Sequence, residues 1–270
     1  EFLIRAGEYT ITPMATMLRL ATRAPGLGDP LSMRKIYRMG EGVPDRETPA
    51  RKKVIQALAD YGELAFTLRE LAEMAVVSSS VVKGLVAQGV VDEEDSPRDL
   101  PYGKLDYTLK GKELSKDQAN AVDKLKEGLQ SKVYGTTLLK GVTGSGKTEV
   151  YLEAVAECIK NGRQALVLLP EIALTSQFLD RVRERFGAMP AEWHSGVTQT
   201  ERRRCWRMVG QGNAELIVGA RSALFLPFRD LGLIVVDEEH DTSYKQEDGA
   251  LYNARDMSVL RAAIGGAQVV

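Results

Sequence analysis

The sequence predicts an α/β protein with a parallel sheet, and two stretches carry this prediction. In the first, residues 141–148 match the pattern G-x-x-x-x-G-K-[ST], with a short, mostly apolar run at 136–140 before them and helical periodicity at 149–161 after them. In the second, residues 231–236 form an apolar run that suits a central strand buried on both faces. A strand, a glycine-rich turn and a helix in this order predict a βα unit of a parallel sheet.

The glycine-rich run is typical of a phosphate-binding loop. Glycines let the backbone turn so tightly that successive N–H groups converge on phosphate oxygens, and the next helix adds the partial positive charge of its N-terminus. We expect Lys147 to reach the β- and γ-phosphates and the Thr148 hydroxyl to hold Mg²⁺, so ATP and Mg²⁺ are the predicted cofactors. The predicted nucleotide-binding residues here are Gly141, Val142, Thr143, Gly144, Ser145, Gly146, Lys147 and Thr148.

A second candidate site follows the apolar run at 231–236, where three carboxylates and an imidazole come in succession, Asp237 to His240. Open parallel sheets bind ligands at the carboxyl ends of their strands. Asp237 is therefore expected to complete the Mg²⁺ shell, and Glu238 to orient and deprotonate the attacking water. Alone, such a run would be read as a solvated acidic turn; beside a phosphate-binding loop, it predicts nucleotide hydrolysis.

The rest of the second half repeats the alternation of strands and helices. This alternation implies right-handed crossovers and a RecA-like α/β domain over residues 114–270. Gln118, one turn into a helix with Ser115 as its candidate N-cap, could bind adenine through its amide, although glutamine is also an ordinary surface residue. Further strands are predicted at 164–169, 191–194 and 215–219, and helices at 116–129, 175–186 and 201–209.

Composition narrows the choice of protein class. The 270 residues suggest one large or two modest domains, and a hydrophobic content of 44% supports a real core. A net charge of −1 gives no global basic field, so any DNA site must be a local patch. Two cysteines fit neither a disulfide framework nor a zinc site, and the sequence shows neither a signal peptide nor a membrane span, which points to the cytoplasm. The missing initial Met and a strand-like end suggest a fragment.

Three segments precede the RecA-like domain. Residues 1–46, with one possible helix in 2–24, are interpreted as the remnant of an N-terminal DNA-binding domain and linker. Residues 47–98 predict three helices (51–61, 68–75 and 78–88) and a β-wing beginning at Val90, the order of a winged-helix domain, and 99–113 form a linker. In a DNA reader the third helix lies in the major groove, but here Lys83 is its single cation. Protein contact and base readout both remain open.

Several motifs together resemble the primosomal protein N′ (PriA) family, the bacterial replication-restart DNA helicases of superfamily 2. They are GVTGSGKTEVY ending at Tyr151, LPEIALT at Thr175, HSG at Gly196, GARSALF at Phe225 and DEEHDTSYKQ at Gln246. The resemblance implies binding of abandoned forks and single-stranded DNA, ATP-driven 3′-to-5′ unwinding, and primosome and single-strand-binding proteins as partners of a monomer. It also implies a third helicase motif, a second lobe with an arginine finger and a zinc region, none of which this sequence contains.

The same resemblance implies roles for individual residues. Gln118 corresponds to the adenine-reading glutamine, and residues 237–240 to the DEAH-type motif, in which His240 couples the nucleotide to DNA; a satisfied loop histidine is the alternative. Residues 241–256 resemble an aromatic-rich loop that stacks on bases, against the alternative of an ordinary polar loop. The predicted DNA-binding or coupling residues are Thr175, Gln177, Arg221, Tyr244, Lys245, Tyr252 and Arg255.

Because the arginine finger raises the hydrolysis rate by orders of magnitude, we expect this chain to bind nucleotide, hydrolyse it poorly and unwind nothing alone. Two other classes stay open. A P-loop enzyme acting on a small molecule would not need Arg221 at a strand end or a tyrosine-bearing loop. A non-catalytic DNA-binding or docking module would not need an intact Lys147 and Asp237.

Overall fold

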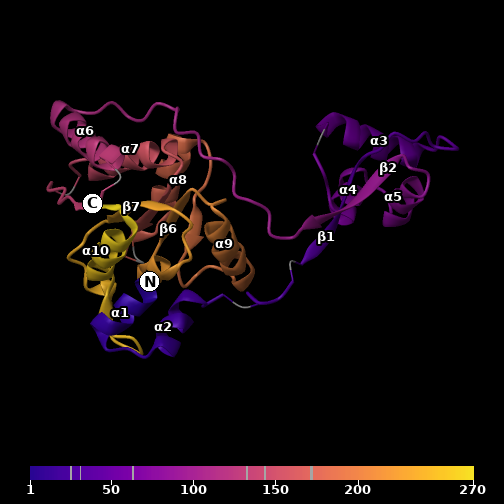
Figure 1. Ribbon diagram of the computed structural model, residues 1–270. Coiled ribbons are helices and arrows are strands. Elements are labelled where there is room, and N and C mark those ends of the chain that lie inside the picture. Colours follow the sequence, from indigo (N-terminus) through magenta and orange to yellow (C-terminus); the bar gives the residue numbers. More distant parts are fainter. Residues whose placement is uncertain (25, 31, 63, 132, 143, 171–172) are drawn as a thin grey trace. The chain divides into compact units, whose positions relative to one another are not determined.

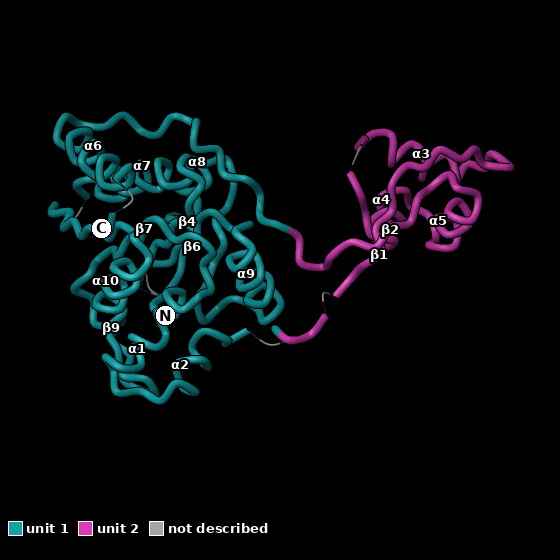
Figure 2. Tube along the Cα trace, viewed as in Figure 1, with its two compact units in different colours: residues 1–27, 101–270 teal, residues 28–100 magenta. Residues whose placement is uncertain are grey.

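The computed structural model describes residues 1–24, 26–30, 32–62, 64–131, 133–142, 144–170 and 173–270 (Figure 1). The chain divides into two compact units (Figure 2). The larger unit consists of residues 1–27 and 101–270, and the smaller one of residues 28–100. These limits differ from the predicted divisions after residues 46, 98 and 113.

The larger unit is built on a six-stranded sheet in the order β3-β10-β7-β4-β6-β5, with parallel pairing throughout. This confirms the predicted α/β fold with a parallel sheet. The central strands β4, β6 and β7 are buried along their whole length, as their apolar sequences require. The strands are β3 (Gly135–Thr136), β4 (Gln164–Leu168), β5 (Ala191–Trp193), β6 (Leu216–Gly219), β7 (Leu231–Val236) and β10 (Gln268–Val269).

Helices cover both faces of this sheet (Figure 1). Neighbouring residues of β7 belong to different cores, Ile234 to one and Val235 to the other, because successive strand side chains point to opposite faces. The core that contains Val235 includes residues of α6, α7 and α8, and the core that contains Ile234 includes residues of α9 and α10. The helices are α6 (Lys116–Ser131), α7 (Lys147–Lys160), α8 (Ser176–Phe186), α9 (Gln199–Gln211) and α10 (Ala254–Gly265), with short 3₁₀ turns η2 (Arg221–Phe225) and η3 (Thr242–Tyr244).

The N-terminal segment differs from its prediction. It forms two helices, α1 (Phe2–Thr10) and α2 (Met14–Ala21), rather than one, because Pro13 between them lacks the N–H that a continuous helix needs. Both pack on the larger unit: the Phe2 ring lies 5.5 Å from that of Phe225, and the Trp206 indole donates to the Ala21 carbonyl over 2.6 Å. Residues 1–27 are therefore part of the larger unit, not of a separate remnant.

Two further predictions need correction. The strand expected at 136–140 is limited to β3, which pairs with β10 at two positions only. The loop expected at 241–256 contains a short hairpin, β8 (Lys245–Gln246) and β9 (Tyr252–Asn253), and α10 follows directly. Short strands of this kind have too little hydrophobic alternation to be recognised in a sequence.

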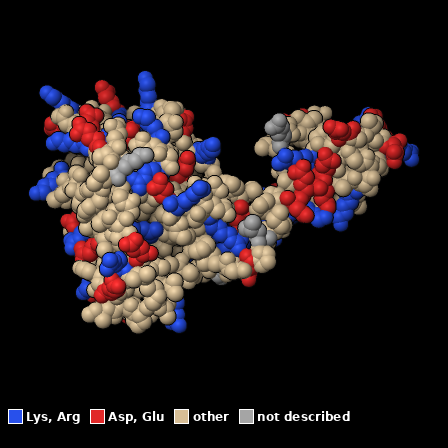
Figure 3. All heavy atoms as spheres, viewed as in Figure 1, with Lys and Arg blue, Asp and Glu red and all other residues tan. Residues whose placement is uncertain are grey.

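The smaller unit has the three predicted helices, α3 (Pro49–Tyr61), α4 (Leu68–Met74) and α5 (Ser79–Val86), which share a core of their own. Thr67 caps α4 in a reciprocal capping box with Glu70. The expected wing strand is β2 (Val91–Pro97), and its antiparallel partner is β1 (Met33–Met39), which lies in the segment predicted to precede this domain. Acidic side chains gather over this strand pair (Figure 3). The winged-helix assignment stays a prediction.

Within the described ranges, none of the helices is long and apolar enough to cross a membrane. Cys158 and Cys205 are both free and buried.

Candidate nucleotide-binding site

The predicted phosphate-binding loop leads into the N-terminus of α7. Gly144 and Gly146 have φ values of 80° and 79°, in the left-handed region that favours glycine. The Ser145 N–H donates to the Val142 carbonyl over 3.0 Å and closes the turn. The Lys147 ammonium donates to the Gly141 carbonyl over 2.9 Å, so the lysine side chain folds back across the loop. Thr143, predicted to bind nucleotide, lies outside the described residues.

Gln118 joins the start of α6 to this loop. Its Oε1 accepts from the Ser115 N–H at 2.8 Å, while its own N–H donates to the Ser115 hydroxyl at 3.3 Å, which is the reciprocal pattern of a capping box. Its Nε2 donates to the Ser145 carbonyl over 2.8 Å. A Cβ at Gly146 would displace this amide, and the φ of Gly146 itself favours glycine. Gln118 thus lies against the phosphate-binding loop, and adenine binding through its amide stays a prediction.

The acidic turn begins where β7 ends. The Asp237 N–H donates to the Leu168 carbonyl of β4 over 3.1 Å. Its carboxylate accepts from two donors, the Glu238 N–H at Oδ1 and the Tyr151 hydroxyl at Oδ2, each at 3.0 Å. Glu238 has a φ of 50°, which is unusual for a residue other than glycine and turns the chain sharply at this point.

One open cleft of about 540 Å³ brings most of the predicted site together. Gly141 and His240 instead line an adjoining cleft of about 880 Å³, which shares Val142, Lys147, Asp237 and Glu238 with the first. Two hard oxygen ligands, the Thr148 hydroxyl and the Asp237 carboxylate, line the first cleft, and this donor set suits Mg²⁺. The predicted residues that line the first cleft are Gln118, Val142, Gly144, Ser145, Gly146, Lys147, Thr148, Asp237 and Glu238.

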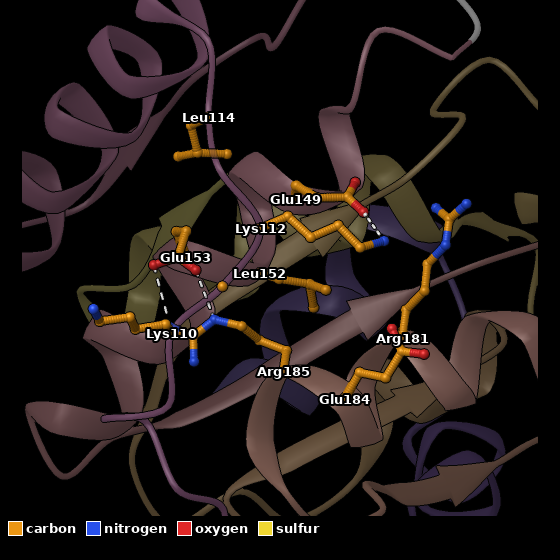
Figure 4. A pocket seen from close by; sticks show the side chains of 10 residues that line it. Lys110, Lys112, Leu114, Glu149, Leu152, Glu153, Arg181, Glu184 and Arg185 are labelled. Carbon is orange, nitrogen blue, oxygen red and sulfur yellow. Dashed lines mark hydrogen bonds and ion pairs between the residues drawn. The ribbon is translucent and has the colours of Figure 1, made fainter.

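Sequence reasoning missed residues from the 101–113 segment and from α8. Lys112 and Arg181 line the cleft and also a smaller cavity of about 140 Å³ beside it, shown in Figure 4. There Lys112 pairs with Glu149 in the first turn of α7 at 3.1 Å. The tertiary fold brings these residues together from distant parts of the chain, so no local sequence pattern predicts that they line the cleft.

The same close-up shows how this segment is attached. The buried Arg185 pairs with Glu153 through two contacts of 2.6 and 3.2 Å (Figure 4). Its third nitrogen donates to the Leu109 carbonyl over 2.6 Å. The segment predicted to be a linker is therefore held against α7 and α8 on its way to the cleft.

Three of the predicted coupling residues, Arg221, Tyr244 and Lys245, belong to a connected cluster beside the acidic turn. Arg221 donates to the carbonyls of Ser243 and Lys245 over 2.7 and 2.9 Å. The Tyr244 hydroxyl donates to the carbonyls of Asp237 and Leu168 over 2.6 and 2.9 Å. A chain of hydrogen bonds therefore links the end of β6 to the ends of β7 and β4.

The two tyrosines of this cluster differ from expectation. Tyr244 is 1% and Tyr252 5% exposed, so neither ring offers a free face to a base in this conformation. The neighbouring Ala250 is also buried, as its apolar side chain favours. Stacking through these rings stays a prediction that requires the hairpin to move.

The remaining predicted residues lie at or near the surface. Thr175 caps α8 by accepting from the Phe178 N–H, and Gln177 is exposed in the first turn of that helix. The His240 side chain is 75% exposed and lies 3.8 Å from Glu238. Arg255 pairs with Glu239 at 3.1 Å and with Asp256 at 3.0 Å.

Residues 115–263 match the model of the DEAD/DEAH box helicase family. The chain therefore belongs to this family of helicases. Among individual proteins, it is 44% identical over 180 residues to the replication restart protein PriA of Rickettsia felis, covering 67% of this chain and 27% of that protein. It is 36% identical over 234 residues to PriA of Bacillus subtilis, covering 86% and 29%. These findings confirm the resemblance stated from the motifs.

PriA of Chlamydia pneumoniae is 40% identical over 206 residues, covering 75% of this chain and 28% of that protein. The chain thus spans between 27% and 29% of the length of these three relatives. A crystal structure of the DUF1998 helicase MrfA is similar at a TM-score of 0.39 and 19% identity, covering 58% of this chain and 26% of that one, which is too distant to support an argument.

Proposed function

We propose that this chain is the nucleotide-binding lobe of an ATP-dependent DNA helicase that remodels stalled or abandoned forks in replication restart. The observation that supports this proposal is a single cleft in which the glycine-rich loop and Lys147 lie with Asp237 and Glu238. The name of the relatives, replication restart protein, supports the cellular role. The 3′-to-5′ direction of unwinding rests on the resemblance of the motifs.

The residues of the cleft divide the chemistry between them. Lys147 would bind the β- and γ-phosphates when a phosphate oxygen replaces the Gly141 carbonyl as the acceptor of its ammonium. Thr148 and Asp237 would hold Mg²⁺, which, when bound, neutralises charge on the triphosphate. Glu238, at the sharp backbone turn that follows β7, is the proposed base for the attacking water.

Gln118 has the hydrogen-bonding capacity that adenine recognition needs. Its amide offers two donors and two acceptor sites, and the structure uses one of each, for Ser145 and Ser115. The remaining donor and acceptor match the N7 and the exocyclic amine of adenine. Because the same amide holds the Ser145 carbonyl, base recognition would bear directly on the phosphate-binding loop.

The hydrogen-bonded cluster around Tyr244 is the proposed link to DNA. Arg221, Lys245 and Tyr252 belong to it or to the hairpin beside it, so movement of this hairpin would reach the Asp237 backbone through the Tyr244 hydroxyl. His240 is the second proposed coupling residue. Thr175, Gln177 and Arg255 are further DNA contacts proposed from the motifs. Primosome and single-strand-binding proteins are the partners proposed for the whole protein, in the cytoplasm.

The test is calorimetric titration of the chain with ADP and Mg²⁺. We expect saturable binding that Lys147→Ala weakens at least about tenfold, because the loop loses its phosphate-binding cation. Lys160→Ala, at the opposite end of the same helix and paired with the nearby Glu157, is the matched control and should bind like the unmutated chain.

The titration is then repeated with single-stranded DNA. Tighter ADP binding with DNA present would show coupling within this lobe. Failure of the unmutated chain to bind ADP, or equal binding by Lys147→Ala, would contradict the assignment of the loop.

A further inference from the structure

Tyr151 is a buried tyrosine that ends the motif of the phosphate-binding loop and has no part in the proposed chemistry. It lies on α7, one helical turn after Thr148, and is 2% exposed among the residues of an apolar core. Burying a phenol there costs free energy unless its hydroxyl forms a hydrogen bond. The partner is the Asp237 carboxylate, 3.0 Å away across the cleft floor.

This contact fixes a carboxylate that would otherwise turn about its own side-chain bonds. The Glu238 N–H holds Oδ1 and the Tyr151 hydroxyl holds Oδ2, so both oxygens have a defined direction. Each oxygen still keeps a lone pair for a metal ion, since a carboxylate has about four acceptor sites. Tyr151 therefore orients Asp237 through a hydrogen bond, as neighbouring residues commonly orient metal ligands.

The phenol is a donor at neutral pH. A phenol keeps its proton at neutral pH, because its ordinary pKa is about 10. The proton on the phenol is directed to Asp237, as the 3.0 Å contact shows.

We propose that Tyr151 is a positioning residue for the divalent cation, whose hydroxyl orients the Asp237 carboxylate toward the metal held with Thr148. This inference rests on the proposed function, because it assigns a role within the same nucleotide site. Partners of this kind commonly change metal affinity by about 10- to 100-fold when they are removed.

The test compares ADP binding by the full chain across a Mg²⁺ series and in EDTA. Tyr151→Phe keeps the ring in the core and removes only the hydroxyl. We expect it to raise the Mg²⁺ concentration needed for half of the metal-dependent gain in ADP affinity by about tenfold or more. ADP affinity in EDTA should stay unchanged. Direct Mn²⁺ binding in the presence of ADP, followed by electron paramagnetic resonance, should weaken by a similar factor.

Tyr102→Phe is the matched control. The Tyr102 hydroxyl also donates to a carboxylate, that of Glu201 at 2.6 Å, in the same unit but outside both clefts. It should leave the metal dependence unchanged. A merely structural role for Tyr151 would lower the melting temperature and leave the metal dependence as it was, and that outcome would overturn the proposal.

Asp237→Asn supplies a second variant that leaves the core ring in place. In this background the metal dependence should be weak already, and adding Tyr151→Phe should weaken it no further, because the hydroxyl acts through the carboxylate. An equal, independent loss in both backgrounds would also overturn the proposal. Absence of Mg²⁺-dependent ADP binding in the unmutated chain would instead contradict the proposed function itself, so the two failures are distinguishable.

Discussion

The Gln164 side chain links several backbone segments at the start of β4, which is the end of the strand opposite the cleft. Its Nε2 donates to the carbonyls of Val209 and Ala214, and its Oε1 accepts from the N–H groups of Arg229 and Asp230. The residue is 4% exposed, so its amide is largely shielded from water and depends on these four backbone groups for hydrogen bonds. All the hydrogen-bonding capacity of the amide is used.

Gln164→Met is therefore expected to destabilise the larger unit. Methionine is similar in length but leaves the Ala214 carbonyl and two N–H groups without this partner, each at a cost of roughly 1–3 kcal/mol before relaxation, whereas the Val209 carbonyl keeps the Gly212 N–H as a donor. We expect the free energy of unfolding to fall by about 3–5 kcal/mol in urea titration. The control is Gln130→Met, an exposed position, where the change should stay within about 0.5 kcal/mol. Equal effects of the two substitutions would contradict this role of the amide.

At the scale of elements, the structure of the segment from Leu105 to Lys112 differs clearly from its prediction. It has no secondary structure and was predicted to be a linker, but four contacts attach it along the larger unit. The Leu105 N–H donates to Glu215, the Asp106 N–H to the Phe186 carbonyl, Arg185 to the Leu109 carbonyl, and Lys112 to Glu149. We call residues 105–112 the strap.

Arg185→Ala is expected to release the strap. It removes the donor to Leu109 and leaves the Glu153 carboxylate, 19% exposed, without its paired cation. Losing one partner of a buried ion pair costs about 3–5 kcal/mol, and we expect the lower part of that range because Glu153 keeps some contact with water. The rate of amide hydrogen exchange at residues 105–112 should therefore rise in the Arg185→Ala variant.

Arg183→Ala is the matched control for the strap. Arg183 lies on the same helix with a side chain 63% exposed and a contact of 3.7 Å to Asp180. Exposed pairs of this kind contribute at most about 1 kcal/mol, so exchange in the strap should not change. Unchanged exchange in Arg185→Ala would show that the other three contacts suffice.

The elements that the sequence predicted share a physical cause. β4, β6, β7 and the helices between them have strong periodicity or continuous apolar runs, and the cleft residues sit where such strands end. What it did not predict depends on contacts between distant segments. The Tyr244 ring is buried by neighbours that its local pattern does not reveal, and the acceptor of the Tyr151 hydroxyl lies in the turn after β7, far from α7 in the sequence.

At the scale of the whole molecule, the smaller unit has its own core and its own balance of charge. Residues 28–100 contain 10 basic and 13 acidic side chains. Cations on β1 face acids on β2: Lys35 pairs with Glu93, and Arg38 lies 4.0 Å from Glu94. Phosphate binding needs cations that are free to replace counterions, and these two are already paired within the strand pair.

We therefore expect the smaller unit to bind duplex DNA weakly. A peptide of residues 28–100, first checked for helical folding by circular dichroism, should bind a short duplex in fluorescence anisotropy no more tightly than about 10⁻⁵ M at physiological salt. Glu93→Gln with Glu94→Gln should tighten binding several-fold, because Lys35 and Arg38 then become available to phosphates. Asp45→Asn with Asp60→Asn, two exposed acids outside the strand pair, controls for the change of two in net charge. Nanomolar binding by the unmutated peptide with a steep salt dependence would favour DNA, rather than a protein, as the partner of this unit.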